Sequence, residues 1–432
     1  MAAASAVPSP DNEPPSVESS LSWSRKDIGV WVVLLAVFLH LLGFTVTGPI
    51  LPALTEHFNL PHAKVGYLTS SYPLGMFFAL FVWPKLSDAI GRKPVIVFSL
   101  LGVGIGFVLQ GIAVARGWPL WTFLALRVAS GALAGASPVV KAYIADVTPS
   151  KDLPKYMGWR EAACTLAFIV GPTLGGFLFT TWSLAPVISI SGWASICAAL
   201  LVAYFLTEDT PPGGRVSAKD ASGVDAAAQA DELAEPCFSC PLGTSLVVAV
   251  GTICVVSFLY NTGQATYDAF FTVMASSKFH LTAQQIGYML TGLAMVSLGV
   301  SAFGFAAIQK RVGITVTSVL GLTLVAAGLA GIGFTSSPLG FIVCAAVYVV
   351  GVPLYTPSVP ILLMQCVPPA KRGFIMGLDS AVNTVGRIMG PIAFGVLYAA
   401  QGASACFYIA SVIVICAALF TLVRWLIVLR SP

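Results

Sequence analysis

The sequence predicts an all-α membrane protein in which twelve transmembrane helices form two pseudo-symmetric six-helix bundles. The first observation is composition: 57% of the 432 residues are hydrophobic and only 9% are charged, with a mean hydropathy of +0.88. Soluble domains carry roughly 25% charged residues, so a polytopic membrane protein is the class that fits. The second observation is a series of twelve apolar stretches. The third is a repeat that divides these stretches into two sets of six.

Each apolar stretch is about as long as a helix that crosses a bilayer, which needs roughly 20 residues. The first stretch follows a polar segment that lacks the basic-then-apolar pattern of a cleaved signal, so we expect this stretch to serve as the insertion signal. The predicted spans are residues 29–52, 65–84, 94–114, 120–145, 158–180, 185–206, 243–268, 286–307, 313–334, 338–363, 375–398 and 404–427.

The distribution of basic residues predicts the orientation of the spans. An even number of spans places both termini on one side, and most Lys and Arg residues lie in the ends and loops of that side. Only Lys64, Arg116 and Lys278 lie in loops of the other side. Because cytoplasmic loops are enriched in Lys and Arg, we predict that both termini are cytoplasmic. The formal charge of +4 is spread along these loops, so we expect no nucleic-acid partner.

Two polar segments lie outside the predicted bundles. Residues 1–28 contain several prolines and serines and are predicted to be a disordered cytoplasmic amino terminus. Residues 207–242 change to a composition rich in Pro, Gly, Ala and acidic residues, which is typical of a flexible linker. The amino-terminal bundle is then residues 29–206 and the carboxy-terminal bundle residues 243–428.

Most of the nine cysteines lie inside apolar stretches, where they act as small apolar residues. Cys237 and Cys240 lie in the predicted linker, but no second pair or nearby His completes a zinc site. Two unmodified thiols are the simpler interpretation, and palmitoylation beside the membrane is the alternative. We therefore expect no disulfide framework, no metal and no cofactor.

The two halves of the chain repeat each other. The segment Phe58–Tyr67 (FNLPHAKVGY) recurs as Phe279–Tyr288 (FHLTAQQIGY), and Met157–Gly176 recurs as Met376–Gly395 with matching Met-Gly and Gly-Pro pairs. The two pairings have nearly the same offset, which chance similarity between apolar segments does not explain. Parallel repeats of six spans with a site between them at the membrane midplane are typical of transporters that work by alternating access.

A short charged loop at Pro84–Pro94 joins the second and third spans. It resembles the signature loop of the major facilitator superfamily, which reads Gly-x-Leu-Ser-Asp-Arg-x-Gly-Arg-Arg/Lys. The matching residues here are Asp88, Gly91, Arg92 and Lys93. A basic loop that only sets the orientation of the spans is the alternative.

This resemblance implies the fold of that superfamily and a role for the loop. In the family's packing, Asp146 at the end of the fourth span meets Arg92, so that Asp88, Arg92 and Asp146 form a cytoplasmic latch. The resemblance implies that this charge cluster holds the outward-open state.

The fourth span contains Arg127-x-x-x-Gly131, which resembles a second signature of proton-coupled members of the family. A permanently charged guanidinium within a span is costly unless it faces a cavity or a partner, so Arg127 is a candidate for proton transfer and substrate response. The alternative is a structural Arg. Lys141 lies fourteen residues further on, within about 40° of the same helical face. It either lines the same cavity wall or extends to the membrane surface.

The fifth span contains Gly171, Pro172, Gly175 and Gly176, and this pattern resembles the exporter motif Gly-x-x-x-Gly-Pro-x-x-Gly-Gly. Small residues allow a neighbouring helix to approach closely, and a proline inside a helix bends it. The eleventh span repeats the pair as Gly390 and Pro391. We expect these bends to pivot and seal during transport, and ordinary packing of small residues is the alternative.

Further polar side chains within the spans are candidates for the solute and proton path. They are His40, Asn261, Gln264, Asp268, Asp379 and Arg387. A coupling group must change its charge near the working pH, which histidine does and which buried carboxyls do in some proteins. His40 and Asp268 are therefore the leading candidates for proton carriers.

The chain is similar to the drug:proton antiporter branch of the major facilitator superfamily, which includes tetracycline exporters. This similarity implies a secondary active transporter, not an enzyme, that exchanges a small, amphiphilic or drug-like organic solute for protons by rocking of its halves. The expected partners are the solute, protons and the lipid bilayer, and the expected state is a monomer. Alternatives are an uptake symporter or facilitator for an organic anion or other metabolite, motivated by Arg127, Lys141 and Arg387, and a non-transporting receptor with the same fold. No phosphate-binding motif for ATP occurs.

Overall fold

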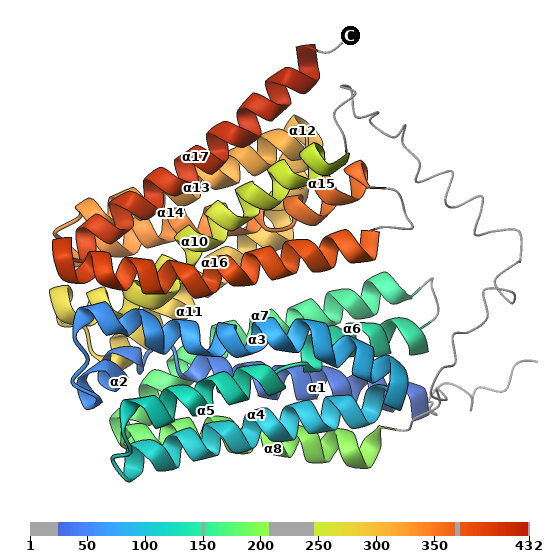
Figure 1. Ribbon diagram of the computed structural model, residues 1–432, viewed down its shortest axis with the longest axis vertical. Helices are drawn as coiled ribbons and strands as arrows, with labels where there is room; N and C mark the ends of the chain where they lie inside the picture. The colour runs from blue at the N-terminus through green and yellow to red at the C-terminus, as the bar shows by residue number, and fades with distance from the viewer. Residues whose placement is uncertain (1–24, 149–151, 207–245, 368–371, 431–432) are drawn as a thin grey trace, which may run out of the picture.

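The computed structural model describes residues 25–148, 152–206, 246–367 and 372–430, and every regular element within these residues is a helix (Figure 1). The predicted linker 207–242, with Cys237 and Cys240, and residues 1–24 of the predicted amino-terminal segment 1–28 lie outside the described residues. The remaining four residues of that segment, 25–28, are helical and begin α1. The first half contains α1 (Arg25–Val46), α2 (Leu51–His57), α3 (His62–Ile90), α4 (Arg92–Ala115), α5 (Leu120–Leu133), α6 (Ala136–Val147), α7 (Leu153–Thr181) and α8 (Leu184–Phe205). The second half contains α10 (Leu246–Phe279), α11 (Ala283–Gly299), the π-helical turn η2 (Val300–Gly304), α12 (Phe305–Val312), α13 (Ile314–Phe334), α14 (Pro338–Tyr355), α15 (Ser358–Cys366), α16 (Arg372–Gln401) and α17 (Ala403–Arg430).

These helices correspond to the twelve predicted spans and confirm the fold class. Three spans are assembled from more than one helix, namely α5 with α6, α11 with η2 and α12, and α14 with α15. By length and hydropathy, ten spans among the described residues are able to cross a membrane. The other two predicted spans correspond to α10 and α16, which are also long enough to cross a membrane, and α16 contains the charged residues Asp379 and Arg387.

The interruptions within spans have local causes. Pro138 has no N–H group for the carbonyl of Ala134 four residues earlier, and α5 ends directly before that residue. The backbone N–H of Gly135 donates instead to Ser99 Oγ at 2.9 Å. In the second half, Pro357 follows the last residue of α14 by two positions and separates α14 from α15. Each half is therefore broken in its fourth span, as a repeat requires.

The turns after the second span of each half are also equivalent. Gly91 joins α3 to α4 with φ 98° and ψ 162°, and Gly313 joins α12 to α13 with φ 82° and ψ 164°. These backbone angles are accessible to glycine but strained for other residues. The glycines thus permit two long antiparallel spans to be joined by a single residue.

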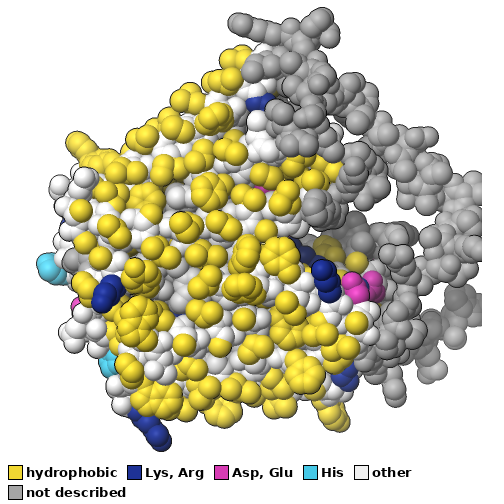
Figure 2. All heavy atoms as spheres, viewed as in Figure 1, with side chains coloured by type: hydrophobic (Ala, Val, Ile, Leu, Met, Phe, Trp, Pro, Cys, Tyr) yellow, Lys and Arg dark blue, Asp and Glu magenta, His cyan; other side chains and the backbone are white. Residues whose placement is uncertain are grey.

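The two halves of the molecule meet along two helix pairs, α3 with α16 and α7 with α11. We call the end at which α8 ends and α10 begins the linker end, and the end that holds α2 the α2 end. In Figure 1 the ribbons of the two halves lie close together at the α2 end, on the left, and spread apart towards the linker end. The outer surface is largely hydrophobic (Figure 2), with the rings of Phe303, Phe334 and Tyr204 among the most exposed. Such a surface is typical of a protein surrounded by lipid.

Candidate functional site

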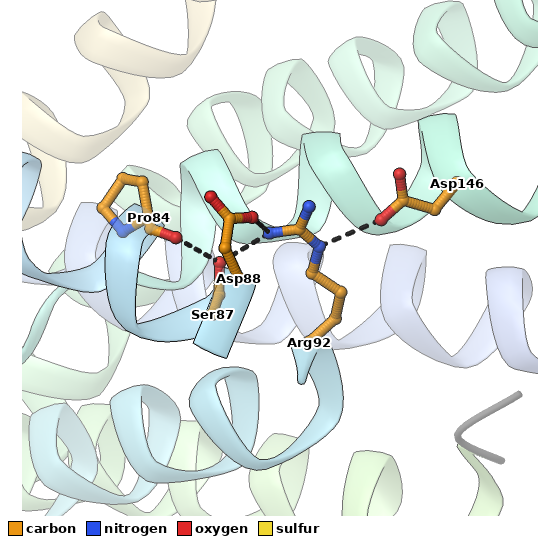
Figure 3. A network of polar contacts seen from close by, with 5 residues as sticks. All are labelled: Pro84, Ser87, Asp88, Arg92 and Asp146. Carbon is orange, nitrogen blue, oxygen red and sulfur yellow. Dashed lines mark hydrogen bonds and ion pairs between the residues drawn. The ribbon is translucent and has the colours of Figure 1, made fainter. Parts of the chain in front are cut away.

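The predicted loop cluster is present as a network around Arg92 (Figure 3). Arg92 Nη1 lies 2.6 Å from Asp88 Oδ1, and Arg92 Nε lies 2.9 Å from Asp146 Oδ2. Arg92 Nη1 also donates to Ser87 Oγ at 2.6 Å, and that hydroxyl donates to the carbonyl of Pro84. One guanidinium thus connects the ends of α3 and α6 to the start of α4. Lys93 is the next residue of α4 and makes no ion pair with any described residue.

All members of this network belong to the first half of the chain. The network is formed in a structure whose halves are in contact at the α2 end, so it is not restricted to a conformation closed at the linker end. Its predicted role in holding the outward-open state stays a prediction. The geometry does establish that Arg92 is the centre of the cluster, with Gly91 supplying the turn that places it there.

The contacts between the halves at the α2 end join the two repeated motifs crosswise. A methyl group added at Gly66 would lie 1.9 Å from the carbonyl oxygen of Pro391, and one added at Gly287 would lie 2.4 Å from that of Pro172. Each Gly-Pro motif therefore contacts the Gly-Tyr motif of the opposite half. We call these contacts, with those of Gly176 and Gly395 to the opposite half, the α2-end interface.

Hydrogen bonds also cross the α2-end interface. The hydroxyls of Thr173 and Thr291 lie 2.6 Å apart, and Thr291 lies at the same distance from the carbonyl of Ile169. On the other helix pair, Ser70 Oγ donates to the carbonyl of Ile388 at 2.7 Å. The interface thus consists of close backbone contacts and a few hydroxyl bonds, without an ion pair between described residues of the two halves.

The glycines of the fifth span have two different neighbours. Gly171 and Gly175 face α1, because a methyl group at either position would lie 1.9 Å from Thr45 Oγ1 or 2.2 Å from the carbonyl of Val46. Gly176 faces the opposite half at Ala283. The same helix therefore packs tightly on its own half and on the other. In the eleventh span, Gly390 faces α10 and Pro391 contacts Gly66.

An ion pair lies near the middle of the second half. Arg387 Nη2 of α16 is 3.9 Å from Asp268 Oδ2 of α10, and both side chains are almost half exposed, at 43% and 45%. Asp268 precedes the end of α10 by eleven residues, about 16 Å at 1.5 Å per residue. Asp268 therefore lies well inside α10 and not at one of its ends. Arg387 also lies within electrostatic range of Tyr72 on α3, which places the pair beside the first half.

Arg127 also lies within electrostatic range of Tyr72. Its guanidinium lies 5.8 Å from the centre of the Phe123 ring, and its Nε is buried without a hydrogen-bond partner. It lines a small cavity with Gln110, whose amide nitrogen donates to Ser130 Oγ at 3.0 Å. Tyr72 is therefore within electrostatic range of a cation from each half.

Comparison with known proteins identifies the architecture. A family model described as the Major Facilitator Superfamily matches residues 33–250 and 253–432. The chain belongs to this superfamily. The protein is therefore a membrane transporter of a small solute and not an enzyme.

Relatives of this major facilitator protein include drug-resistance proteins. "Multidrug resistance protein 1" of Bacillus subtilis (strain 168) is 25% identical over 379 residues, covering 87% of this chain and 90% of the relative. "Tetracycline resistance protein, class C" of Escherichia coli is also 25% identical over 379 residues, covering 86% and 90%.

Solved structures of the superfamily share the fold. The human organic anion transporter MFSD10 (TETRAN) aligns with a TM-score of 0.66 at 20% identity, covering 92% of this chain and all of that one. A bacterial homologue of the human lysosomal transporter Spinster, in an inward-facing and occupied conformation, aligns with a TM-score of 0.73 at 15% identity, covering 91% and 96%.

Other predicted site residues of this transporter lie apart from the central pair. His40 Nδ1 is 3.2 Å from Ser195 Oγ on α8, within its own half. Lys141 Nζ is 3.9 Å from Glu161 Oε1, and the break between α5 and α6 separates Lys141 from Arg127. Asn261 Nδ2 donates to the carbonyl of Ser257 one turn earlier. The structure thus brings together Asp268 and Arg387 but not Arg127 and Lys141.

Sequence reasoning missed several residues that the fold of this transporter brings to the site. Tyr72 lies within electrostatic range of Arg127 and Arg387, and the hydroxyls of Thr173 and Thr291 join the halves. None of these three had a signal in the sequence. Glu161, which is evident from the sequence as an acid near the start of the fifth span, contacts both Lys141 and the buried Arg160.

Proposed function

We propose that the protein exports small amphiphilic organic compounds in exchange for protons by alternating access. The observation that carries this proposal is the ion pair between Asp268 of α10 and Arg387 of α16. A proton that binds the carboxylate removes its charge, and the attraction to the guanidinium is lost. Asp268 then pairs either with Arg387 or with a proton. In the proposal, this exchange of partners couples solute binding to proton binding.

The relatives support the choice of solute. Two proteins that match most of this chain carry the names multidrug resistance and tetracycline resistance protein. The rings of Tyr267 and Tyr348 are buried and stacked, with centres 4.1 Å apart, and support the part of α10 that carries Asp268.

The α2-end interface supports the alternating-access part of the proposal. It closes one end of the molecule with contacts that are short and few, so a rigid rocking of the halves breaks them together. The helices α7 and α16 carry both the proline motifs and the contacts. In the proposal, the network around Arg92 stabilises the first half as the molecule closes at the linker end.

The orientation and state of assembly complete the proposal. The linker end faces the cytoplasm, because most basic residues of the loops lie at that end. The working unit is a monomer, since one chain supplies both halves and the central pair.

A transport assay tests this function. The purified protein is reconstituted into liposomes that contain ethidium or tetracycline, and a pH gradient is imposed. Solute movement against its concentration gradient, driven by the pH gradient and lost in Asp268→Asn, supports antiport. Equilibration that ignores the pH gradient contradicts it and indicates a facilitator.

Transport of an organic anion is the second candidate function. Arg127 and Arg387 both lie near Tyr72, and Asp268 is the one acid paired with either among the described residues. This excess positive charge favours an anionic solute. Fluorescein added to the same liposome panel separates the two functions, since saturable fluorescein transport without transport of ethidium favours the anion.

A further inference from the structure

A polar cluster is buried in the second half near the linker end, apart from the central ion pair. Asp379 of α16 is 7% exposed, and Asn383 Nδ2 donates to its Oδ2 at 2.9 Å. The hydroxyl of Ser257 on α10 lies next to this carboxyl and next to the phenol of Tyr355 on α14. Three helices therefore direct polar groups to one buried point.

The cluster contains unmade hydrogen bonds. Four of its oxygen atoms are buried without a hydrogen-bond partner, namely Asp379 Oδ1, Asn383 Oδ1, Ser257 Oγ and Tyr355 Oη. Buried polar atoms in folded proteins are normally paired. Asp379 Oδ1 and Asn383 Oδ1 can only accept, whereas the hydroxyls of Ser257 and Tyr355 can each donate one proton. A neutral carboxyl at Asp379 adds a further donor to the cluster.

Among the residues that the structure describes, no side-chain cation pairs with Asp379. The ion pairs between described residues do not include it, and the titratable groups that face it are Cys254 of α10 and Tyr355 of α14. From α17, Arg424 donates to Cys366 instead. A lone carboxylate inside a membrane span is costly and is a feature of proton relays.

The first half has no such acid at the equivalent place. The offset that relates Pro172 to Pro391 relates Arg160 to Asp379, and both side chains are buried. Arg160 is paired with Glu161 and donates to Ser137 Oγ at 2.6 Å. Within the described residues, the two repeats therefore contain a partnered cation in one half and an acid without a cation in the other.

Two polar stripes connect the cluster to the central ion pair. On α16, Asp379, Asn383 and Arg387 follow at intervals of four residues, so they lie on one face of the helix. On α10, a matching face carries Ser257, Asn261, Gln264 and Asp268. The two helices pack against each other. The stripes meet at Asp379 beside Ser257 and at Arg387 beside Asp268.

We propose that Asp379, with Ser257, Asn383 and Tyr355, forms a second proton-binding site that exchanges protons with the linker side and is connected to the Asp268–Arg387 pair by the two stripes. Hydronium gives its proton to a carboxylate oxygen, one O–H bond forms, and water leaves. The new hydroxyl donates to one of the unpaired oxygens beside it. The proposal that the site binds a proton depends only on the geometry of the cluster. The proposal that transport uses this site rests on the proposed function.

Infrared difference spectroscopy of the full chain in lipid tests the site without transport. The carbonyl band of protonated carboxyl groups is followed as pH is changed in the wild type, Asp379→Asn, Asp268→Asn and the control Ser380→Ala, which alters an exposed hydroxyl on the same helix. We expect Asp379→Asn to remove one component that the other two variants retain. An unchanged band in Asp379→Asn overturns the proposal.

Two further measurements guard against a folding defect and separate the two proposals. Asp379→Glu keeps a carboxyl, so a retained but displaced band is expected, whereas its loss contradicts proton binding at this place. In transport, the number of protons exchanged per solute falls by one in Asp379→Asn. If Asp379→Asn leaves the number of protons per solute unchanged, the site is not used in coupling. If the wild type itself shows no proton coupling, the proposed function is contradicted. The infrared spectrum decides in either case whether Asp379 binds a proton.

Discussion

Gly66 and Pro391 contact each other through their backbones although they belong to opposite halves of the chain. A methyl group at Gly66 would lie 1.9 Å from the Pro391 oxygen, and the repeat produces the same contact between Gly287 and Pro172. Because no side chain separates these backbones, any residue larger than glycine at either position disfavours closure of the α2 end. The repeated motifs of the sequence are therefore the two sides of one interface.

Substitution of Gly66 or Gly287 by alanine should open the α2 end. The added methyl group overlaps a backbone atom, and overpacking of this kind costs about 1–3 kcal/mol. That is about a 5- to 150-fold shift towards conformations open at the α2 end. Dyes attached to cysteines at Glu56 and His280, exposed positions on opposite halves at this end, report the change as a longer distance.

Gly292→Ala is the matched control, because it lies on the same helix as Gly287 and nothing lies within 4 Å of an added methyl group. It should leave the dye distance unchanged. An equal distance in wild type and Gly66→Ala would show that this contact does not limit opening.

The hydroxyl contact of Thr173 with Thr291 should contribute to closure at the α2 end. A hydrogen bond of this type contributes about 1 kcal/mol, which corresponds to roughly a fivefold change in the open population. The contribution is isolated by a double-mutant cycle with Thr173→Val and Thr291→Val, measured with the same dyes. Additive effects of the two substitutions would mean that the hydroxyls do not interact.

The sequence predicts the spans well and the site only in part. The twelve helices follow from apolar length, and the cluster around Arg92 is predicted because its members resemble a family loop. Asp268 and Arg387 are each identified as charges inside spans, but their pairing depends on how α10 and α16 are rotated against each other. That rotation is set by packing, as is the position of Tyr72. Local sequence patterns carry no information on either.

Removal of Asp88 should impair transport more than stability. Its side chain is 67% exposed, and exposed ion pairs contribute about 0–1 kcal/mol to folding. We therefore expect Asp88→Asn to be expressed and to unfold at nearly the wild-type temperature, but to lose transport. Arg92→Ala removes the contacts to Asp88, Asp146 and Ser87 together and should affect both properties. Normal transport by Asp88→Asn would exclude the latch role.

Substitutions of Asp268 and Arg387 should distinguish solute exchange from proton-coupled transport. Asp268→Asn keeps the shape of the side chain but cannot bind and release a proton, so transport driven by a pH gradient should fall to background while exchange of labelled for unlabelled solute persists. Arg387→Gln leaves the carboxylate at 3.9 Å without its cation, and the double variant Asp268→Asn with Arg387→Gln should recover the folding stability that the single Arg387 variant loses. The measurements are gradient-driven uptake, solute exchange and thermal unfolding on the same preparations.

Glu56→Gln, which changes an exposed acid at the α2 end, is the control and should leave all three measurements unchanged. Gradient-driven transport that survives in Asp268→Asn would transfer the coupling role to another group.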